Sequence, residues 1–188
     1  MKKNKTSKKF VYLISPDKIE NEQFYINLAL VLSSRKVSFF QLRLKKETNQ
    51  NKFIIGKKIK KICKKYKVKF LINDDPLLAK KLNADGCHLG QKDMNLIEAR
   101  KILKNKIIGI TCHNSINLAK RAIKDGANYL AFGAFYSSKT KTVKYKARLT
   151  ILKSVKKITS LPIVAIGGIK LNNYKKLLLN KANFLAIS

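Results

Sequence analysis

Residues 71–93, LINDDPLLAKKLNADGCHLGQKD, form the stretch that decides the fold. The apolar run 70–72 predicts a short buried strand, and Pro76 then opens a helix over 77–82. The segment 84–89 predicts a second short strand directly after that helix. Two strands joined by a helix are typical of a parallel βαβ unit, in which both strands run in the same direction.

An acidic residue stands at or just beyond the end of each of these strands, at Asp74 and at Asp93. In a parallel unit both strand ends face the same edge of the sheet, so the two carboxylates can converge on one cation. The chain has only 10 Asp and Glu against 42 Lys and Arg, which argues against a chance placement. Such carboxylates suit Mg²⁺ bridging a polyphosphate, whereas the alternative is that both residues cap the helices that follow them.

The alternation of apolar strands and amphipathic helices continues along the whole chain. Strands are predicted at 10–15, 37–42, 68–73, 84–89, 107–111, 129–132, 162–166 and 184–187. Helices are predicted at 21–34, 52–66, 77–82, 96–103, 116–125, 149–158 and 171–180. The strands are short, apolar and β-branched, which is typical of strands buried on both faces. The pattern predicts an α/β fold, a (β/α)8 TIM barrel; a doubly wound sheet is the alternative.

A barrel of this length is short, because about 250 residues are usual and this chain has 188. We expect a basic, disordered tail at 1–9 and a single TIM-barrel domain at 10–188. The sequence reaches Ser188 directly after the eighth strand, so we expect a barrel lacking the final C-terminal helix. The N-terminal segment or a second subunit would then cover the exposed face of the eighth strand, which makes a homo-oligomer an expected partner.

The formal net charge of +32 and the pI near 10.2 are typical of proteins that bind nucleic acid. Only 5 of the 42 basic residues are Arg, however, and the Lys residues are spread over almost every predicted helix. This distribution favours a general compositional bias, and we expect no specific nucleic-acid partner. A positive field would still attract phosphorylated substrates.

The sequence contains no apolar run near the roughly 20 residues that cross a bilayer, so we expect no membrane partner. The N-terminal residues MKKNKTSKKF are basic, but they lead into a predicted strand rather than the apolar core of a signal peptide. We therefore expect a cytoplasmic protein.

Polar residues fall at the carboxyl ends of the predicted strands, where barrel enzymes carry their chemistry. In chain order they are Gln41, Arg43, Lys45, Asn73, Asp74, Gln91, Asp93, Thr111, His113, Ser137 to Lys141, Gly167, Gly168 and Ser188. Gly167–Gly168 and Ile187–Ser188 offer backbone N–H groups for one phosphate, and Arg43, Lys45 and Lys141 offer charge for a second anion. Taken singly, each feature has a structural alternative, such as a solvated charge, a tight turn or a hydrogen-bonded core histidine. Together they predict two phosphorylated substrates, one of them a Mg²⁺-bound pyrophosphate.

These residues belong to motifs that resemble the thiamine-phosphate synthase family over nearly the whole chain, from Phe10 to Ser188. The matching motifs are QLRLK (41–45), INDDPLLA (72–79), ADGCHLGQKD (84–93), GITCH (109–113), GANYLAFGAFYSSKTK (126–141), PIVAIGGI (162–169) and ANFLAIS (182–188). The ADG-HLGQ-D and IGGI pieces are the most specific of these.

The resemblance implies a role for each matching position. The residues implied to bind hydroxymethylpyrimidine pyrophosphate are Gln41, Leu42, Arg43, Leu44, Lys45 and Asn73, with Thr111 and Lys141 implied to be contacts on the pyrophosphate side. Asp74 and Asp93 are implied to hold Mg²⁺. The residues implied to bind thiazole phosphate are Ser138, Lys139, Thr140, Gly168, Ile187 and Ser188.

The implied activity is that of a transferase of thiamine biosynthesis. Mg²⁺ and the catalytic cations Arg43, Lys45 and Lys141 would stabilise departing pyrophosphate, and a pyrimidine methyl cation would form. The thiazole nitrogen would attack that cation to give thiamine phosphate, so no side chain need act as a nucleophile.

Some positions depart from the family pattern. Leu44 replaces a usual acidic residue, Thr111 replaces a usual Ser, Ala134 replaces a common Pro, and the loop 137–141 lacks another. One alternative is a thiazole tautomerase-like isomerase or inactive paralogue, but the presence of Asp74, Asp93 and Lys141 favours the synthase. An alternative of another class is a basic nucleic-acid-binding protein, which would show strongly salt-dependent RNA binding.

Overall fold

The computed structural model describes residues 9–137 and 145–188. The strands are β1 (Val11–Ile14), β2 (Val37–Leu42), β3 (Lys69–Asn73), β4 (Gly86–Leu89), β5 (Ile107–His113), β6 (Tyr129–Phe132), β7 (Ile163–Ile166) and β8 (Phe184–Ile187). The helices are α1 (Gln23–Ser33), α2 (Asn49–Lys65), α3 (Pro76–Lys81), α4 (Leu96–Leu103), α5 (Ile116–Lys124), α6 (Thr150–Lys156) and α7 (Tyr174–Leu179). Strands and helices alternate along the chain, as predicted.

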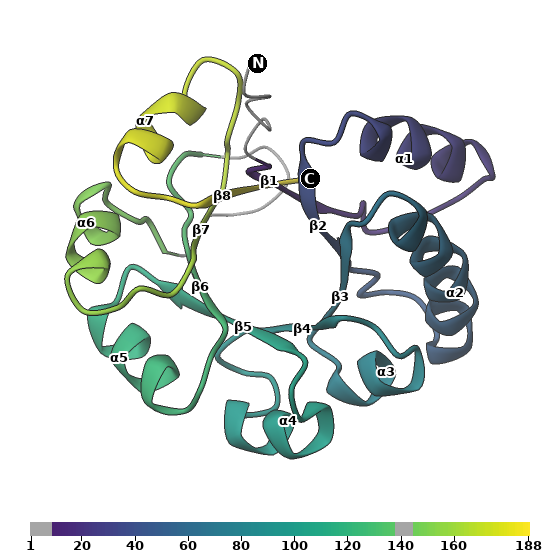
Figure 1. Ribbon diagram of the computed structural model, residues 1–188, viewed down its shortest axis with the longest axis horizontal. Coiled ribbons are helices and arrows are strands. Elements are labelled where there is room, and N and C mark those ends of the chain that lie inside the picture. Colours follow the sequence, from purple (N-terminus) through teal and green to yellow (C-terminus); the bar gives the residue numbers. More distant parts are fainter. Residues whose placement is uncertain (1–8, 138–144) are drawn as a thin grey trace, which may run out of the picture.

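The strands form a closed parallel barrel in sequence order, because β1 pairs with β8 as well as with β2. The helices lie outside this ring of strands, and α7 and α1 flank the place where β8 meets β1 (Figure 1). The predicted (β/α)8 barrel is confirmed. A doubly wound sheet would stay open at its edges, so closure excludes that alternative. No helix follows β8 in the residues that the structure describes.

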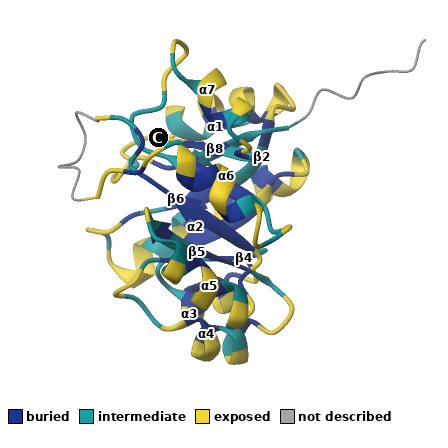
Figure 2. Ribbon diagram, turned by 90° about the vertical axis from the view of Figure 1, so that its left-hand side faces the viewer, coloured by how far each residue is buried: buried dark blue, intermediate teal, exposed yellow. Residues whose placement is uncertain are grey.

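The strands separate two apolar cores. Side chains that point outward from the strands pack against the helices, and they include Leu42, Ile72 and Leu89. Side chains that point inward form a smaller core in the barrel, with Tyr12 and Tyr129 among its buried members. Figure 2 shows the buried strands enclosed by helices whose outer faces are exposed. Because alternate residues of a strand face opposite sides, nearly continuous apolar strands supply both cores.

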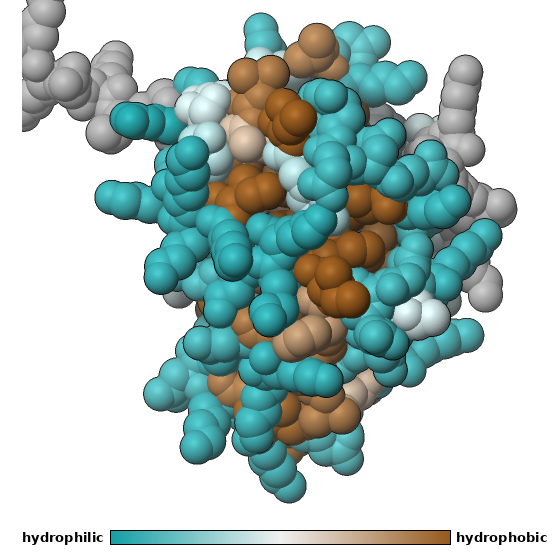
Figure 3. Space-filling view, turned by 90° about the vertical axis from the view of Figure 1, so that its right-hand side faces the viewer, coloured by the Kyte–Doolittle hydropathy of each residue, from teal (hydrophilic) through white to brown (hydrophobic). Residues whose placement is uncertain are grey.

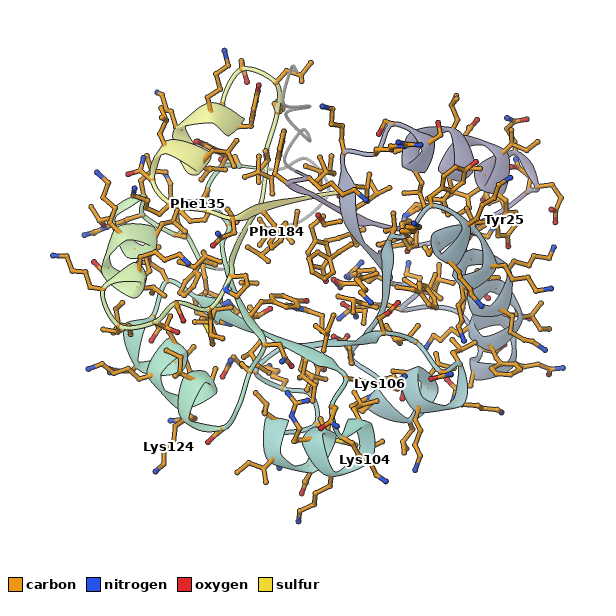
Figure 4. The ribbon with its side chains drawn as sticks, in the orientation of Figure 1. Tyr25, Lys104, Lys106, Lys124, Phe135 and Phe184 are labelled. Atoms are coloured by element: carbon orange, nitrogen blue, oxygen red, sulfur yellow. The ribbon has the colours of Figure 1, made fainter. Side chains whose placement is uncertain are left out.

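Figure 4 shows the same division in the side chains. Phe184 lies inside the ring of strands, where it packs edge-on against Phe39 with ring centroids 5.0 Å apart. Lys104 and Lys124 lie on the outside of the molecule (Figure 4). The barrel interior is therefore a filled core rather than a channel.

Side-chain caps set where several helices begin. Thr48, Asp75, Asn95 and Ser115 each accept a hydrogen bond from a backbone N–H three residues later, at the starts of α2, α3, α4 and α5. The Thr48 cap explains why α2 begins at 49 rather than at the predicted 52. Helix α7 begins at 174 rather than 171, and the side chain of Leu171 is 92% exposed.

The outer surface is dominated by long polar side chains. Figure 3 faces the side that carries α1 and α2 and shows hydrophilic side chains over most of it, with hydrophobic ones between. Exposed apolar residues on this side include Ile26 and Leu30 of α1. Within 9–137 and 145–188, none of the helices combines the length and apolar character that a membrane span requires.

Candidate active site

The carboxyl ends of β3 and β4 bring the two predicted metal ligands together at the mouth of the barrel, which we define as the carboxyl-terminal end of its strands. The backbone N–H of Asp74 donates to the carbonyl of His88 at 2.8 Å, which ties the end of β3 to β4. Asp93 Oδ2 accepts from the Gly90 N–H at 2.7 Å. Burial, a hydrogen bond to Asp74 and the charge of Asp74 raise the pKa of Asp93, while the Gly90 N–H and Lys45 lower it. The carboxyl groups of Asp74 and Asp93 therefore face each other, as the βαβ pattern predicted.

Capping does not account for either carboxylate. Helix α3 is capped by Asp75, whose Oδ1 accepts from the Leu78 N–H at 2.8 Å. Helix α4 is capped by Asn95, whose Oδ1 accepts from the Glu98 N–H. The alternative that Asp74 and Asp93 are helix caps is therefore wrong, because Asp75 and Asn95 cap the two helices instead.

The two predicted cations that follow β2, Arg43 and Lys45, lie at the mouth, and each is paired with a carboxylate. Lys45 Nζ is 3.1 Å from Asp74 Oδ2. The Arg43 guanidinium pairs with Asp17 of the loop between β1 and α1. A cavity of about 210 Å³ opens beside Lys45, Asn73 and Asp74. The site thus combines two carboxylates and two cations at one end of the barrel.

The other members of the 41–45 run are less accessible. The side chains of Leu42 and Leu44 are only 3% exposed each and pack into the outer core. Gln41 is equally buried, but its amide group points into the barrel and donates to Asn73. Any contact of Leu42 or Leu44 with a substrate would therefore use the main chain.

Polar side chains from six different strands form a continuous series of hydrogen bonds across the barrel, which we call the interior hydrogen-bond chain. In order, its members are Asn73, Gln41, Tyr12, Tyr129, His88 and Thr111. Gln41 Nε2 donates to Asn73 Oδ1 at 2.7 Å, and the Tyr12 hydroxyl donates to Gln41 Oε1 at 2.9 Å. The Tyr12 and Tyr129 hydroxyl oxygens are 2.8 Å apart.

The second half of this chain passes through a histidine. The Tyr129 hydroxyl is 2.8 Å from His88 Nδ1, and His88 Nε2 is 2.8 Å from Thr111 Oγ1. Gly109 leaves space for the ring of Tyr129, because a Cβ at position 109 would overlap that ring. His88 keeps part of its surface at the mouth, but loss of water around its ring lowers its pKa to about 4. Burial raises the pKa values of Tyr12 and Tyr129 far above the usual range, so all three groups are neutral at pH 7.

The ends of β7 and β8 carry the predicted phosphate-binding backbone. Gly167 and Gly168 have φ values of +103° and +60°, a region that favours glycine. A Cβ at Gly168 would overlap the backbone of residues 136–137, so this turn packs closely against the segment after β6. Ile187 and Ser188 are exposed at the end of β8. The predicted residues Ser138, Lys139, Thr140 and Lys141 lie outside the described part of the chain.

His113 is the last residue of β5, two residues beyond the predicted end of that strand. Its φ is +52°, and its ring stacks on Tyr145 with centroids 4.1 Å apart. Burial lowers its pKa. It is not a member of the interior hydrogen-bond chain, so the structure assigns it packing contacts rather than contact with the carboxylates.

Four residues of this site escaped prediction from the sequence: Asp17, Tyr12, His88 and Tyr129. For Tyr12, His88 and Tyr129 the available signal was a polar side chain within an otherwise apolar strand, as in Cys87–His88–Leu89. That signal shows its meaning only once the register is known, since Asn73 pairs with His88 across β3 and β4.

A closed parallel barrel with its carboxylates, cations and hydrogen-bonding side chains collected at the carboxyl mouth defines the class of (β/α)8 barrel enzymes. Residues 11–188 match the family model described as "Thiamine monophosphate synthase". The chain belongs to this family, which confirms the resemblance found in its motifs.

Individual relatives agree with the family assignment. A thiamine-phosphate synthase from Pelagibacter ubique (strain HTCC1062) is 85% identical over all 188 residues, which span 91% of that protein. One from Nitrosomonas eutropha is 39% identical over 95% of this chain and 84% of its own length. The solved structure of thiamine phosphate pyrophosphorylase from Pyrococcus furiosus superposes with a TM-score of 0.82 at 27% identity, covering 96% of this chain and 85% of that one.

Proposed function

We propose that this chain is a transferase that joins hydroxymethylpyrimidine pyrophosphate to thiazole phosphate, giving thiamine phosphate and pyrophosphate. The observation that carries the proposal is the cluster of Asp74, Asp93 and Lys45 beside Asn73 at the mouth of the barrel. The 85% identity to a thiamine-phosphate synthase over the whole chain supports it.

The chemistry of the donor set fits Mg²⁺. Asp74 and Asp93 supply hard carboxylate oxygens, which Mg²⁺ prefers. Burial, and after it the hydrogen bond to Asp74 and the charge of Asp74, raise the pKa of Asp93, and a bound cation would favour the ionised carboxylate. Among the described residues no group of three or more His, Cys, Asp or Glu side chains gathers, so substrate oxygens and water would complete the coordination. When bound, the cation would supply charge that stabilises the leaving pyrophosphate.

The protein's own groups would hold and orient the pyrimidine substrate. Lys45 and Arg43 would bind the pyrophosphate once they exchange their carboxylate partners for phosphate oxygens. Asn73 on β3 and Thr111 on β5, the two strands that flank β4, would contact the pyrimidine ring. The carbon–oxygen bond to pyrophosphate then breaks, its electron pair leaves with the pyrophosphate, and the ring stabilises the methylene cation.

The thiazole phosphate would bind at the opposite side of the mouth. The turn at Gly167–Gly168 and the exposed end of β8 would supply backbone N–H groups to its phosphate. The thiazole nitrogen would then give its lone pair to the cationic carbon and close the new carbon–nitrogen bond. Positioning of the two reactants would supply much of the rate, since no side chain forms a covalent intermediate.

Two expectations from the sequence stay predictions. A homo-oligomer that covers the face of β8 would be tested by sedimentation of the purified protein. A cytoplasmic location would be tested by fractionation of cells that express the chain.

The decisive experiment measures thiamine phosphate formed by the purified protein from the two phosphorylated precursors, with Mg²⁺ and with excess chelator. We expect product only with Mg²⁺. An Asp93→Ala variant should lose that activity, because it removes half of the carboxylate pair. Glu98→Ala on the exposed face of α4 is the matched control and should keep it.

Product formed equally with chelator would contradict the Mg²⁺ site. A folded wild-type protein that forms no product would overturn the proposed reaction, and assays for tautomerase activity and RNA binding would follow.

A further inference from the structure

The interior hydrogen-bond chain connects two side chains at the mouth that stand on β3 and β5, the two strands that flank β4. Its ends, Asn73 on β3 and Thr111 on β5, are partly exposed. Its middle members Gln41, Tyr12 and Tyr129 are 3%, 1% and 2% exposed. A buried polar chain in an apolar core must satisfy its own donors and acceptors, because water does not reach it.

The orientation of the Gln41 amide fixes which group donates and which accepts at every link of the interior hydrogen-bond chain. Gln41 Nε2 donates to Asn73, so its Oε1 takes the only hydroxyl proton of Tyr12. The Tyr12 oxygen can then only accept from Tyr129, and the Tyr129 oxygen can only accept from His88 Nδ1–H. A neutral imidazole carries a single N–H, so His88 Nε2 is bare.

The same donor order fixes the hydroxyl of Thr111, the last member of the hydrogen-bond chain, at the mouth. Because His88 Nε2 is bare, the Thr111 hydroxyl must donate its proton to it across the 2.8 Å contact. Thr111 Oγ1 then presents only a lone pair to a ligand. At the other end Asn73 Oδ1 is occupied by Gln41, which leaves the Nδ2 protons of Asn73 to be donated.

We propose that Tyr12, Tyr129 and His88 are positioning residues that hold Thr111 as a hydrogen-bond acceptor and Asn73 as a donor toward the substrate. This inference deepens the proposed function and rests on it for the identity of the ligand. An aminopyrimidine is complementary to this pair, since its amino group donates to Thr111 and a ring nitrogen accepts from Asn73. An oxopyrimidine of the same shape offers an acceptor where Thr111 needs a donor and is rejected.

Tyr12→Phe is the change that tests the polarity from a distance. It removes a hydroxyl that is separated from Thr111 by two members of the hydrogen-bond chain, Tyr129 and His88. The Tyr129 hydroxyl loses its acceptor and turns to His88 Nδ1, because leaving a buried hydroxyl unpaired is unfavourable. The proton of His88 must then move to Nε2, which donates to Thr111 and turns that hydroxyl into a donor toward the mouth.

The first readout is the tautomer of His88, measured by nitrogen-15 NMR of the imidazole ring in the full chain. Only two histidines, His88 and His113, are present, and a His113→Gln variant assigns the signals. We expect the Nδ1–H tautomer in the wild-type protein and the Nε2–H tautomer in Tyr12→Phe. Wild-type protein with the Nε2–H form would overturn the proposal, whether or not any variant folds.

The second readout is discrimination between ligands. We expect hydroxymethylpyrimidine phosphate to compete with the substrate roughly 10-fold or more better than its oxo analogue in the wild-type protein. Tyr12→Phe should reduce this ratio to near one, whereas Tyr25→Phe, in α1 outside the barrel and beside Lys58 of α2, should keep it. An unchanged ratio in a folded Tyr12→Phe protein would overturn the proposed role.

The two readouts separate this inference from the proposed function. The tautomer requires no substrate, so the expected Nδ1–H form without thiamine phosphate synthesis would contradict only the reaction. Synthesis with the Nε2–H form would contradict only the positioning role.

Discussion

The two ends of the barrel use polar side chains in different ways. At the base, which we define as the amino ends of the strands, three polar residues each stand directly before a strand: Asp85 before β4, Asn128 before β6 and Asn183 before β8. Each side chain accepts the backbone N–H of a residue in or beside the preceding strand, at 2.9, 2.8 and 2.9 Å. The backbone N–H groups of Asp85, Asn128 and Asn183 in turn donate to the carbonyls of the same partner residues, Phe70, Ile108 and Ile163. This reciprocal contact locks neighbouring strands in register.

Arg100 extends the same pattern at the base. Its guanidinium donates to the carbonyls of Lys104, Lys106 and Gly126 and to Asn128 Oδ1, at 2.6 to 2.7 Å. Three of these partners are backbone carbonyls, and the fourth, Asn128, itself accepts the backbone N–H of Ile108. Polar groups at the base therefore complete the fold.

At the mouth, polar side chains pair with one another and leave groups turned toward the opening. Asp74 faces Asp93 and Lys45, and Arg43 faces Asp17, in arrangements that a charged ligand can replace. Polar residues at the base thus stabilise the fold, whereas those at the mouth hold charge available to a ligand. Substitutions at the two ends should then separate stability from activity.

Asp74→Asn should give the largest effect. We expect activity to fall about 1,000-fold, because the change removes charge from the site where the leaving group is stabilised. Stability should hold, since Asn tolerates the φ of +64° at this position and like-charge repulsion is removed. Steady-state kinetics and thermal melting measure both. Asp125→Asn at the end of α5 is the control, and a large fall in the melting temperature of Asp74→Asn would contradict the comparison.

The second effect is a loss of stability in acid that originates at the mouth. The pKa of His88 is lowered from 6.5 to about 4, so the unfolded chain takes up a proton before the folded one. This contribution is complete above pH 6.5 and is lost as pH falls toward 4, by up to roughly 3 kcal/mol. Urea unfolding across this range measures it. His88→Gln should flatten the dependence, and an unchanged slope in that variant would show that other groups cause it.

Asn128→Ala should produce the opposite phenotype to Asp74→Asn. It removes the acceptor of the Ile108 N–H and one partner of Arg100, and should cost about 2 kcal/mol of the free energy of unfolding. Activity per folded molecule should stay near wild type. Denaturant titration with parallel assays tests this, and Asn180→Ala at the exposed end of α7 should change stability by less than about 0.5 kcal/mol. A stable but inactive Asn128→Ala protein would contradict a purely structural role for the base.

Asp17→Asn should give the smallest effect. Arg43 must leave Asp17 to bind a pyrophosphate, so removing the competing carboxylate should lower KM for the pyrimidine substrate about 3-fold. Glu20→Gln, on the same loop and paired only with Lys18 among the described contacts, should leave KM unchanged. A raised KM for Asp17→Asn would instead show that Asp17 holds Arg43 in its binding position.

The sequence predicted much of this molecule because its signals are local. Eight apolar strands between amphipathic helices defined the barrel, and Asp74 and Asp93 were expected to meet because parallel strands end at the same edge. Helix boundaries were less exact. The pattern did not show that Thr48 caps α2, or that Asp75 rather than Asp74 caps α3.

The interior hydrogen-bond chain was beyond this kind of inference. Tyr12 and Tyr129 are 117 positions apart, and each stands in a strand whose apolar neighbours predict simple burial. Their hydroxyl groups meet only because closure of the barrel turns alternate residues of β1 and β6 toward a common centre.

The amino-acid sequence by itself thus determined the order of the strands and helices, the excess of positive charge and the carboxylates at two neighbouring strand ends. These depend on residue types and spacings along a single segment. The tertiary structure alone decided which side chains share the interior, how β3 aligns with β4, and which proton donor faces which acceptor. Those relations depend on strand register and barrel closure, which join residues far apart in the chain through contacts of less than 3 Å.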